Sequence, residues 1–169
     1  MSIFSIFINN KIHFSNYITN SFNTNTPKYS TQITNNINNQ QELKGKNWRY
    51  VGQVVNGLRE GKGILYWNDG DRYEGEWRNG KMEGKGIFYF NSGNRYEGNF
   101  RNGKFEGKGI KYWNDGDRYE GDFRNDKKEG KGIYYYHNGD REMGDYYNGN
   151  PMGKHVMLIR NGEVKINNY

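Results

Sequence analysis

The sequence contains no cysteine and little proline or histidine, with two prolines and three histidines. Without cysteine the chain can form no disulfide, no thiolate metal site and no cysteine nucleophile. Apolar residues are also scarce, at 33%, where ordinary globular domains have about 45–50%. The composition therefore excludes a disulfide-stabilised scaffold and argues against a conventional two-layer core.

A long hydrophobic segment is missing as well. The longest apolar run covers residues 3–8 and is interrupted by Ser5, whereas a helix that spans a bilayer needs about 20 apolar residues. Aromatic residues, however, make up 17% of the chain, and its 24 glycines exceed the usual share of roughly 7%. Because disordered chains are poor in aromatic residues, we expect most of this chain to fold.

Acidic residues are missing from one region only. Residues 1–41 hold Lys11 and Lys28 and no acid, whereas residues 50–164 hold 19 basic and 18 acidic residues. The net charge of +6 therefore lies mostly outside the glycine-rich part of the chain, which is nearly neutral. Such a body has no electrostatic basis for binding nucleic acid, and we expect no nucleic-acid partner.

A motif of 23 residues recurs without gaps in the glycine-rich part. The copy that begins at Tyr96 reads YEGNFRNGKFEGKGIKYWNDGDR, and 23 of the 24 glycines stand at five fixed positions of the repeat. An N-terminal extension, residues 1–49, and a C-terminal tail, residues 165–169, flank the repeats. The sequence therefore predicts a repeat array of five copies: 50–72, 73–95, 96–118, 119–141 and 142–164.

Each copy predicts a β-hairpin. In the second copy, Tyr73, Gly75 and Trp77 alternate with charged residues, which is the period of a half-buried strand. Asn79 and Gly80 follow, and this dipeptide is a strong hairpin signal because both residues tolerate positive φ. The sequence thus predicts an all-β fold: a single-layer antiparallel meander of about ten strands, with an irregular N-terminal extension.

One face of this sheet is predicted to carry a ladder of aromatic rings. A single layer leaves that face uncovered, and aromatic side chains on a rigid scaffold are typical of protein interfaces. A variable position in the second strands, occupied by Lys111 in the third copy, indicates that the other face is wet. The rings predicted to bind a partner are Tyr73, Trp77, Tyr89, Tyr96, Phe100, Tyr112, Tyr119, Phe123 and Tyr135.

The unit Y-E-G-x-[WF]-x-N-G-x-x-x-G-x-G resembles the MORN repeat (membrane occupation and recognition nexus). Copies two to four carry the pattern most fully, whereas Val54, Asp126, Glu142 and His155 depart from it. The resemblance implies a rod- or groove-shaped sheet and a place in cytoskeletal, ciliary or membrane-contact assemblies of eukaryotes. In similar proteins such repeats also accompany lipid kinases and methyltransferases, but we expect no catalytic domain here.

No catalytic or metal-binding constellation is evident in the sequence. Ser92, the serine of the repeat array, stands at a turn position that Asp69 and Asp115 fill in other copies, which is typical of a turn former. His137 and His155 have no second histidine or cysteine at a spacing suited to sharing a metal. We therefore expect no enzyme activity, no cofactor and no metal site.

The most apolar stretch of the array lies in the last copy, at the predicted open end of the sheet: Val156, Met157, Leu158 and Ile159. An exposed apolar edge strand aggregates unless something covers it. We predict an interface here, covered by a second copy of the chain in a homodimer, by another subunit, or by the N-terminal extension. The favoured function is a non-catalytic structural adaptor that binds protein subunits of a larger assembly.

The alternative is a peripheral membrane module, because the resemblance implies binding of anionic lipid. Basic residues that recur at the repeat spacing would meet lipid head groups: Arg78, Lys81, Arg101, Lys104, Arg124 and Lys127. Columns of glutamate at the same spacing, such as Glu83, Glu106 and Glu129, leave open a purely structural role in cross-strand charge pairs.

Residues 1–41 differ from the array in composition, with ten asparagines and no acid, arginine or glycine. Three interpretations stay open: an extension that is disordered or ordered by a partner, a mitochondrial targeting segment, or a short helix lying on a membrane. We accordingly expect an intracellular location that is cytoskeletal (cilium or axoneme) or membrane-associated, with the mitochondrion as the alternative.

Overall fold

A computed structural model describes residues 40–169 of the chain. The interpretations of the N-terminal extension fall almost wholly on residues 1–39, which lie outside the described residues. The described part is all-β and forms twelve antiparallel strands. They are β1 (Gln41–Lys44), β2 (Trp48–Val55), β3 (Leu58–Trp67), β4 (Arg72–Arg78), β5 (Lys81–Tyr89), β6 (Arg95–Arg101), β7 (Lys104–Tyr112), β8 (Arg118–Arg124), β9 (Lys127–Tyr135), β10 (Arg141–Tyr147), β11 (Asn150–Leu158) and β12 (Val164–Asn168).

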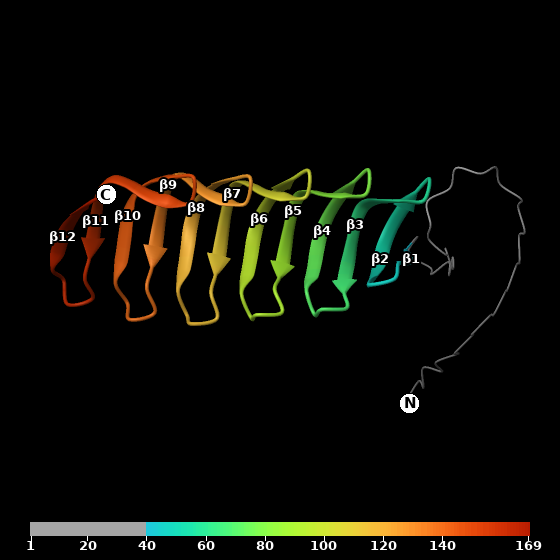
Figure 1. Ribbon diagram of the computed structural model, residues 1–169, viewed down its shortest axis with the longest axis horizontal. Helices are drawn as coiled ribbons and strands as arrows, with labels where there is room; N and C mark the ends of the chain where they lie inside the picture. The colour runs from blue at the N-terminus through green and yellow to red at the C-terminus, as the bar shows by residue number, and fades with distance from the viewer. Residues whose placement is uncertain (1–39) are drawn as a thin grey trace, which may run out of the picture.

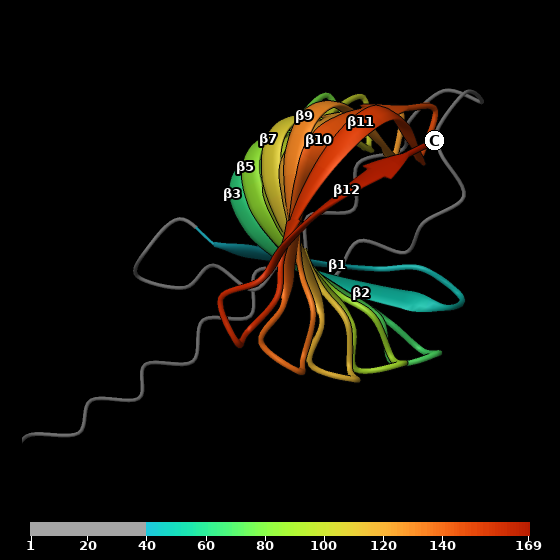
Figure 2. The ribbon, with the colours of Figure 1, turned by 90° about the vertical axis from the view of Figure 1, so that its left-hand side faces the viewer.

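All twelve strands belong to one sheet, in which hydrogen-bonded neighbours are also neighbours in the sequence. Figure 1 shows the hairpins side by side in chain order along the length of the molecule. Viewed along that length in Figure 2, the strands fan out around a common axis, as expected from the right-handed twist of β-strands. The predicted single-layer antiparallel meander is therefore confirmed.

A two-residue turn closes each repeat hairpin. Asn79 and Gly80 have φ values of 49° and 77°, the left-handed pair of a type I′ turn. Asp126 replaces the glycine in the fourth copy and still adopts a φ of 70°. Its carboxylate accepts a 2.8 Å hydrogen bond from the backbone N–H of Phe105 in the preceding hairpin. A side chain thus fits this turn position where it also ties the turn to its neighbour.

A β-bulge bends each repeat hairpin. Between β4 and β5, the register moves from Gly75↔Gly86 to Trp77↔Met82, so that β5 carries extra residues. The same shift recurs in the other repeat hairpins. Because bulges bend strands and increase their twist, each hairpin acquires the curvature that Figure 2 shows.

The core consists of tyrosine rings that lie over facing glycines. Tyr96 is fully buried, and its hydroxyl donates a 3.0 Å hydrogen bond to the backbone carbonyl of Asn99. A Cβ atom added to Gly98 would lie 2.6 Å from the Tyr96 oxygen and 2.6 Å from the Cα of Gly109. Glycine is therefore required where the ring crosses the strands. The same arrangement recurs at Tyr50, Tyr73 and Tyr119.

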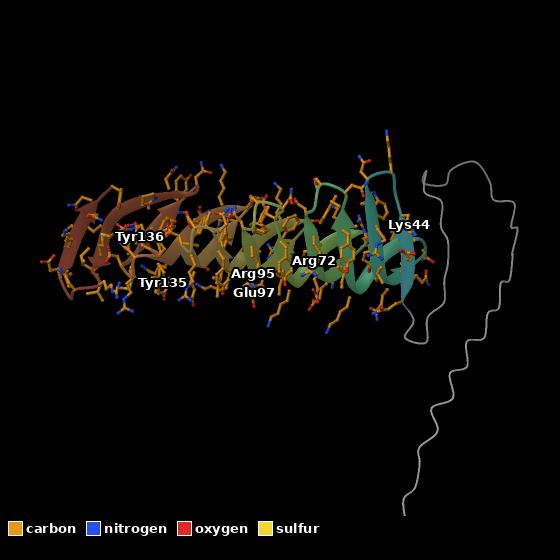
Figure 3. All side chains as sticks on the ribbon, turned by 90° about the horizontal axis from the view of Figure 1, so that it is seen from below. Lys44, Arg72, Arg95, Glu97, Tyr135 and Tyr136 are labelled. Carbon is orange, nitrogen blue, oxygen red and sulfur yellow. The ribbon has the colours of Figure 1, made fainter. Side chains whose placement is uncertain are left out.

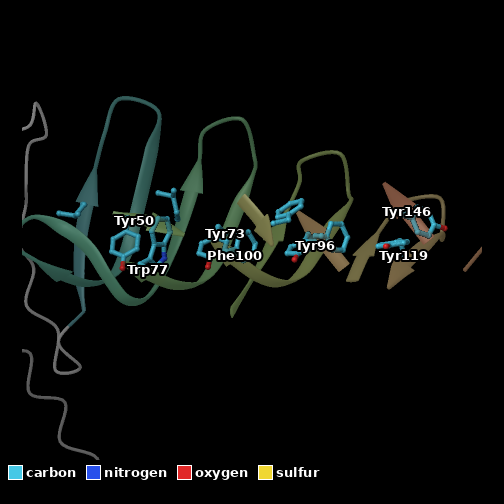
Figure 4. Packing of buried hydrophobic residues seen from close by; sticks show 11 residues of the cluster. Tyr50, Tyr73, Trp77, Tyr96, Phe100, Tyr119 and Tyr146 are labelled. Carbon is cyan, nitrogen blue, oxygen red and sulfur yellow. The ribbon is translucent and has the colours of Figure 1, made fainter. Parts of the chain in front are cut away.

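Rings of successive copies pack against one another and make the core continuous (Figure 4). Tyr73 contacts Phe100 of the next copy with ring centroids 4.8 Å apart, and Tyr96 contacts Phe123 at 5.0 Å, both edge-to-face. Aromatic pairs of this kind contribute about 0.5–1.5 kcal/mol each beyond the area that they bury. Stability in this array therefore comes from contacts between neighbouring repeats.

The sheet extends past the five repeats at both ends. β1 precedes the first copy and buries Leu43, and β12 lies almost entirely in the C-terminal tail. β12 pairs with β11 from Lys154↔Asn168 to Leu158↔Val164.

The predicted open edge in the last copy is therefore wrong for the stretch Val156, Met157, Leu158 and Ile159. The first three of these residues lie in β11, which has a hydrogen-bonded strand on each side. Ile159 follows β11, and its backbone N–H donates to the carbonyl of Glu163. The chain's own tail covers this edge, an arrangement that the sequence interpretation did not consider.

Candidate functional site

The side chains divide between two faces, because successive residues of a strand point to opposite sides of the sheet. We call the face with the buried tyrosines the tyrosine face, and the opposite one the groove face. In the β4–β5 register, Tyr73 lies opposite Phe88 on the tyrosine face, and Glu74 lies opposite Ile87 on the groove face. The two faces offer different chemistry to a partner.

Six of the rings predicted to bind a partner belong to the buried core: Tyr73, Trp77, Tyr96, Phe100, Tyr119 and Phe123. Each is 4% exposed or less, so the expectation that they lie free on an open face is wrong. Rings of adjacent copies pack so closely that they cover one another without a second layer. Burial also raises the pKa of the Tyr73 and Tyr96 hydroxyls.

The other three predicted rings are half-buried and lie on the groove face: Tyr89, Tyr112 and Tyr135. A guanidinium covers each of them, as that of Arg72 does at 4.1 Å from the centre of the Tyr89 ring. The same arginines approach glutamates, as Arg95 does at 3.8 Å from Glu97. Figure 3 labels Arg72, Arg95, Glu97 and Tyr135 of this set along the length of the sheet. These rings form a polar border of the groove face.

The tyrosine face also carries a row of half-buried rings that the sequence did not predict as a contact surface: Trp67, Phe88, Phe90, Trp113, Tyr134 and Tyr136. Phe88 and Phe90 lie 4.6 Å apart, and both pack against the core. The variable position of the second strands belongs to this row, since Leu65 at that position is only 3% exposed. The expectation that this position lies on a wet face is wrong, because Phe88 faces Tyr73 across the strands.

The groove face contains a groove of about 1480 Å³ that extends from Gln40 to Lys154. Its floor is a row across the strands in which isoleucine and glutamate alternate: Ile64, Glu74, Ile87, Glu97, Ile110, Glu120 and Ile133. Met143, Val156 and Ile166 continue the row and are 39%, 39% and 56% exposed. The groove therefore has a floor of alternating apolar and acidic residues, and the row that continues beyond it toward the C-terminus is apolar.

The predicted lipid contacts lie at or beside the hairpin turns and are all exposed: Arg78, Lys81, Arg101, Lys104, Arg124 and Lys127. Arg101 pairs with Glu106 at 3.6 Å. The glutamates at this position also tie neighbouring copies together, as Glu83 does by accepting a 2.9 Å hydrogen bond from the backbone N–H of Asn102. Lys81 donates to the Asn102 side chain at 3.3 Å. Part of this charge pattern therefore stabilises the stack.

The last copy carries a buried pair of ionisable side chains, Glu142 and His155, which are 4% and 0% exposed. His155 Nε2 lies 2.8 Å from the carbonyl oxygen of Asp145, so this nitrogen carries the proton. Its Nδ1 lies 3.6 Å from Glu142 Oε1, which is too long for a hydrogen bond.

Three side chains hold the Glu142 carboxylate: Tyr136 and Tyr169 donate at 2.9 and 2.8 Å, and Asn167 donates at 2.7 Å. Burial by itself would raise the pKa of Glu142, but these hydrogen bonds outweigh it and hold the pKa below its ordinary value. Glu142 is therefore an ionised anchor for the C-terminal strand.

Within residues 40–169, no three histidine or acidic side chains gather as a metal site would require. The same part of the chain holds no helix of the length and apolarity needed to cross a bilayer.

Comparison with known proteins places the repeats in a family. A family model described as MORN repeat matches residues 50–72, 73–95, 96–118 and 119–141. The fifth predicted copy lies outside this match, although β10 and β11 continue the hairpin pattern there. No curated protein matches significantly.

Among solved structures, one similar chain is the TCP domain of SAS-4 (dCPAP) of Drosophila melanogaster, in complex with a proline-rich motif of Ana2 (dSTIL). It is 14% identical, with a TM-score of 0.48, and the match covers 88% of this chain and 99% of that chain.

Proposed function

Since this chain belongs to the MORN repeat family, we propose that it is a non-catalytic scaffold that binds a segment of another protein along the groove face. The groove carries this proposal. It extends across the repeats with a regularly spaced floor, and its apolar residues have no second layer above them in the described part of the chain. Repeat arrays commonly use such extended surfaces for binding.

The C-terminal end of the groove, together with the apolar row that continues beyond it, is the part best suited to an apolar contact. Met143 and Val156 stand in the row where glutamate alternates with isoleucine in the middle copies. Both are large apolar side chains and 39% exposed. An exposed apolar patch bordered by charged residues is typical of an interaction surface. The partner segment therefore gains most of its apolar burial at this end.

A groove variant tests the proposal. Ile87→Lys with Ile110→Lys places a lysine between facing glutamates, so that new cross-strand charge pairs support the fold while the floor loses its apolar character. The matched control, Val55→Lys with Met152→Lys, makes the same change at residues that are 54% and 51% exposed and lie outside the groove.

The measurement is affinity purification of each tagged variant from the protein's own cells, followed by quantitative mass spectrometry. We expect the groove variant to lose partners that the wild type and the control variant both retain. The identity of these partners also reports whether the assembly is cytoskeletal, membrane-associated or mitochondrial. An identical set of partners for all three proteins would contradict binding through the groove.

A second candidate function, binding of anionic lipid, is supported by the exposure of basic residues at the hairpin turns. Lys81, Lys104 and Lys127 recur there at the repeat spacing. If they contact lipid head groups, pelleting with anionic vesicles should fall steeply as salt rises. Equal pelleting with neutral and anionic vesicles would exclude these lysines as the contact.

A further inference from the structure

Two lysines interrupt the apolar pattern of the tyrosine face at neighbouring positions. Lys111 stands where other copies have Leu65, Phe88 and Tyr134, and Lys128 stands where other copies have Met82 and Phe105. Both lysines are half-buried. Charged side chains are rarely buried without a partner, because removing an ammonium group from water is costly.

Aromatic rings surround both ammonium groups. The Nζ atom of Lys128 lies 4.7 Å from the centre of the Tyr146 ring and 5.3 Å from that of Tyr134. The Nζ atom of Lys111 lies 5.4 Å from the centre of the Trp113 ring. The Trp113 and Tyr134 rings are 5.4 Å apart and connect the two lysines. The two charges therefore share one aromatic surface, which we call the lysine pair site.

The lysine pair has no carboxylate partner among residues 40–169: neither Nζ atom forms an ion pair or a hydrogen bond there. On the groove face, by contrast, Lys108 lies 2.9 Å from Asp122 and Lys131 lies 3.2 Å from Asp145. Burial lowers the pKa of both Lys111 and Lys128, and the charge of Lys111 lowers that of Lys128 further, whereas Asp126 and Glu142 act in the opposite direction. A bound anion would offset the lowering further.

Three carboxylates act on the lysine pair or on the Tyr134 ring beside it, and each already has other partners. Asp126 accepts from the Phe105 backbone at 2.8 Å, and Asp117 accepts from the Tyr134 hydroxyl at 2.8 Å. Glu142 accepts from three donors in the C-terminal copy. These groups define the field around the site, but none of them pairs with either lysine.

We propose that Lys111 and Lys128 together bind a carboxylate side chain in an acidic segment of a partner protein, whose apolar neighbours cover Trp113 and Phe90. The proposal rests on the protein-binding function proposed above and adds a second contact surface, on the face opposite the groove. A carboxylate has two oxygen atoms, so that each ammonium group can donate one hydrogen bond to it. Charge-assisted hydrogen bonds of this kind are among the strong ones.

The charges of the chain indicate which kind of group binds at the lysine pair site. Residues 1–39 contain no acidic side chain, so the N-terminal extension has no side-chain carboxylate for the site. A phosphate dianion is disfavoured, because Asp117, Asp126 and Glu142 repel two negative charges more strongly than one. Phosphate sites also favour arginine, whose planar group binds two oxygens at once, and neither residue here is arginine.

The test uses fluorescence anisotropy with the full chain and three labelled peptides. All three alternate leucine and phenylalanine with one other residue, which is glutamate in the first, glutamine in the second and phosphoserine in the third. The variant is Lys111→Gln with Lys128→Gln. The matched control, Lys44→Gln with Lys46→Gln, removes two exposed lysines that lie outside the groove and away from the lysine pair site. Circular dichroism verifies that both variants fold.

We expect the glutamate peptide to bind the wild type and to lose about tenfold or more in affinity on the Lys111/Lys128 variant, which is the effect of losing hydrogen bonds to a charged group. The control variant should change by less than about twofold. Equal affinity for the glutamate and glutamine peptides, or an equal loss in both variants, would overturn the lysine pair site. So would no binding of the glutamate peptide, or binding of the phosphoserine peptide alone.

The two proposals fail independently of each other. If the groove variant loses partners but the glutamate peptide does not bind at the lysine pair, the scaffold function stands and the lysine pair site is contradicted. Binding of the glutamate peptide at the lysine pair, together with an unchanged set of partners for the groove variant, would relocate protein binding to the tyrosine face.

Discussion

The four copies in residues 50–141 and the last copy fill the same space with different side chains. In the middle copies a tyrosine ring lies over two facing glycines, as Tyr119 does over Gly121 and Gly132. In the last copy Glu142 stands at the tyrosine position and His155 at the second glycine position. The imidazole of His155 occupies the space over Gly144. The ring has thus moved from one strand to the strand that faces it.

The hydrogen bond moves together with the ring. In the middle copies the tyrosine hydroxyl donates to the carbonyl three residues later, as Tyr73 does to Glu76 at 3.0 Å. His155 Nε2 donates to Asp145, which occupies the same position of the repeat. The edge-to-face contact is also retained, since His155 and Tyr146 lie 5.1 Å apart, as do Tyr73 and Trp77. The repeat thus constrains the space and its acceptor, while the residue that fills it can change.

The replacement of tyrosine by glutamate at position 142 also explains how the array ends. A tyrosine at position 142 and a glycine at position 155 would complete one more regular copy, whereas the carboxylate of Glu142 binds the Asn167 and Tyr169 side chains. These two residues belong to β12 or directly follow it. The last copy therefore uses a buried charge to hold a closing strand. Terminal repeats commonly differ from internal ones for this reason.

The largest effect is expected in the regular copies, from Tyr96→Ala. The variant removes a fully buried ring that contacts Phe105 and Phe123, and loss of a buried aromatic side chain costs about 3–5 kcal/mol. The measurement is the free energy of unfolding in urea, followed by circular dichroism. Tyr96→Phe keeps the ring, loses the hydrogen bond to Asn99 and should cost only about 1 kcal/mol. Equal losses in both variants would show that the hydroxyl dominates.

A double-mutant cycle tests the exchange in the last copy. Glu142→Tyr alone brings a second ring into the space that His155 fills, and His155→Gly alone leaves Glu142 beside an empty space. Together the two substitutions restore the arrangement of the middle copies. We expect a favourable coupling free energy of about 1–3 kcal/mol in urea unfolding. Additivity within about 0.5 kcal/mol would mean that the two residues do not share the space.

Acid should weaken the last copy through Glu142. Its pKa in the folded chain lies below the ordinary value, so its contribution is complete above the unfolded pKa, near 4.3, and is lost as the pH falls through the lower folded pKa. The difference in unfolding free energy between wild type and Glu142→Gln should therefore be largest at neutral pH and shrink as the solution becomes more acidic. Asn167→Ala removes one donor to the carboxylate and should reduce the same pH dependence. A difference that is constant with pH would contradict this role.

The repeats and turns can be predicted well from the sequence, whereas the burial of the side chains cannot. The Asn-Gly dipeptides identify turns such as Asn79–Gly80, because few other residues adopt two positive φ values in succession. The aromatic spacing places Tyr73 and Trp77 on one face, but it does not show how closely neighbouring copies approach. Their rings are buried because adjacent hairpins curve and pack edge-to-face, an effect of bulges between strands that local patterning does not reveal.

Two further features depend on contacts that the repeat pattern does not contain. β12 lies largely beyond the last copy, and its residues Val164–Asn168 carry neither the glycines nor the aromatic residues of the repeat. Lys111 resembles a solvent-facing residue in the sequence, yet it lies beside Phe90 and Trp113. Its identity suggests a wet face, whereas its register, opposite Tyr96 and Tyr119, places it on the tyrosine face.

The smallest effect is expected at the turn of the fourth copy, from Asp126→Gly. Glycine relieves the strain of a φ of 70°, which favours the variant, but the hydrogen bond from the Phe105 backbone is lost. Because each term is worth about 1 kcal/mol, the net change in unfolding free energy should stay below about 1 kcal/mol.

The reciprocal control is Gly103→Asp at the same turn position of the third copy, where the backbone φ is 82°. It should be tolerated only if its carboxylate accepts from Met82 as Asp126 accepts from Phe105. A large loss in Gly103→Asp together with no change in Asp126→Gly would show that the aspartate contributes nothing to the contact between copies.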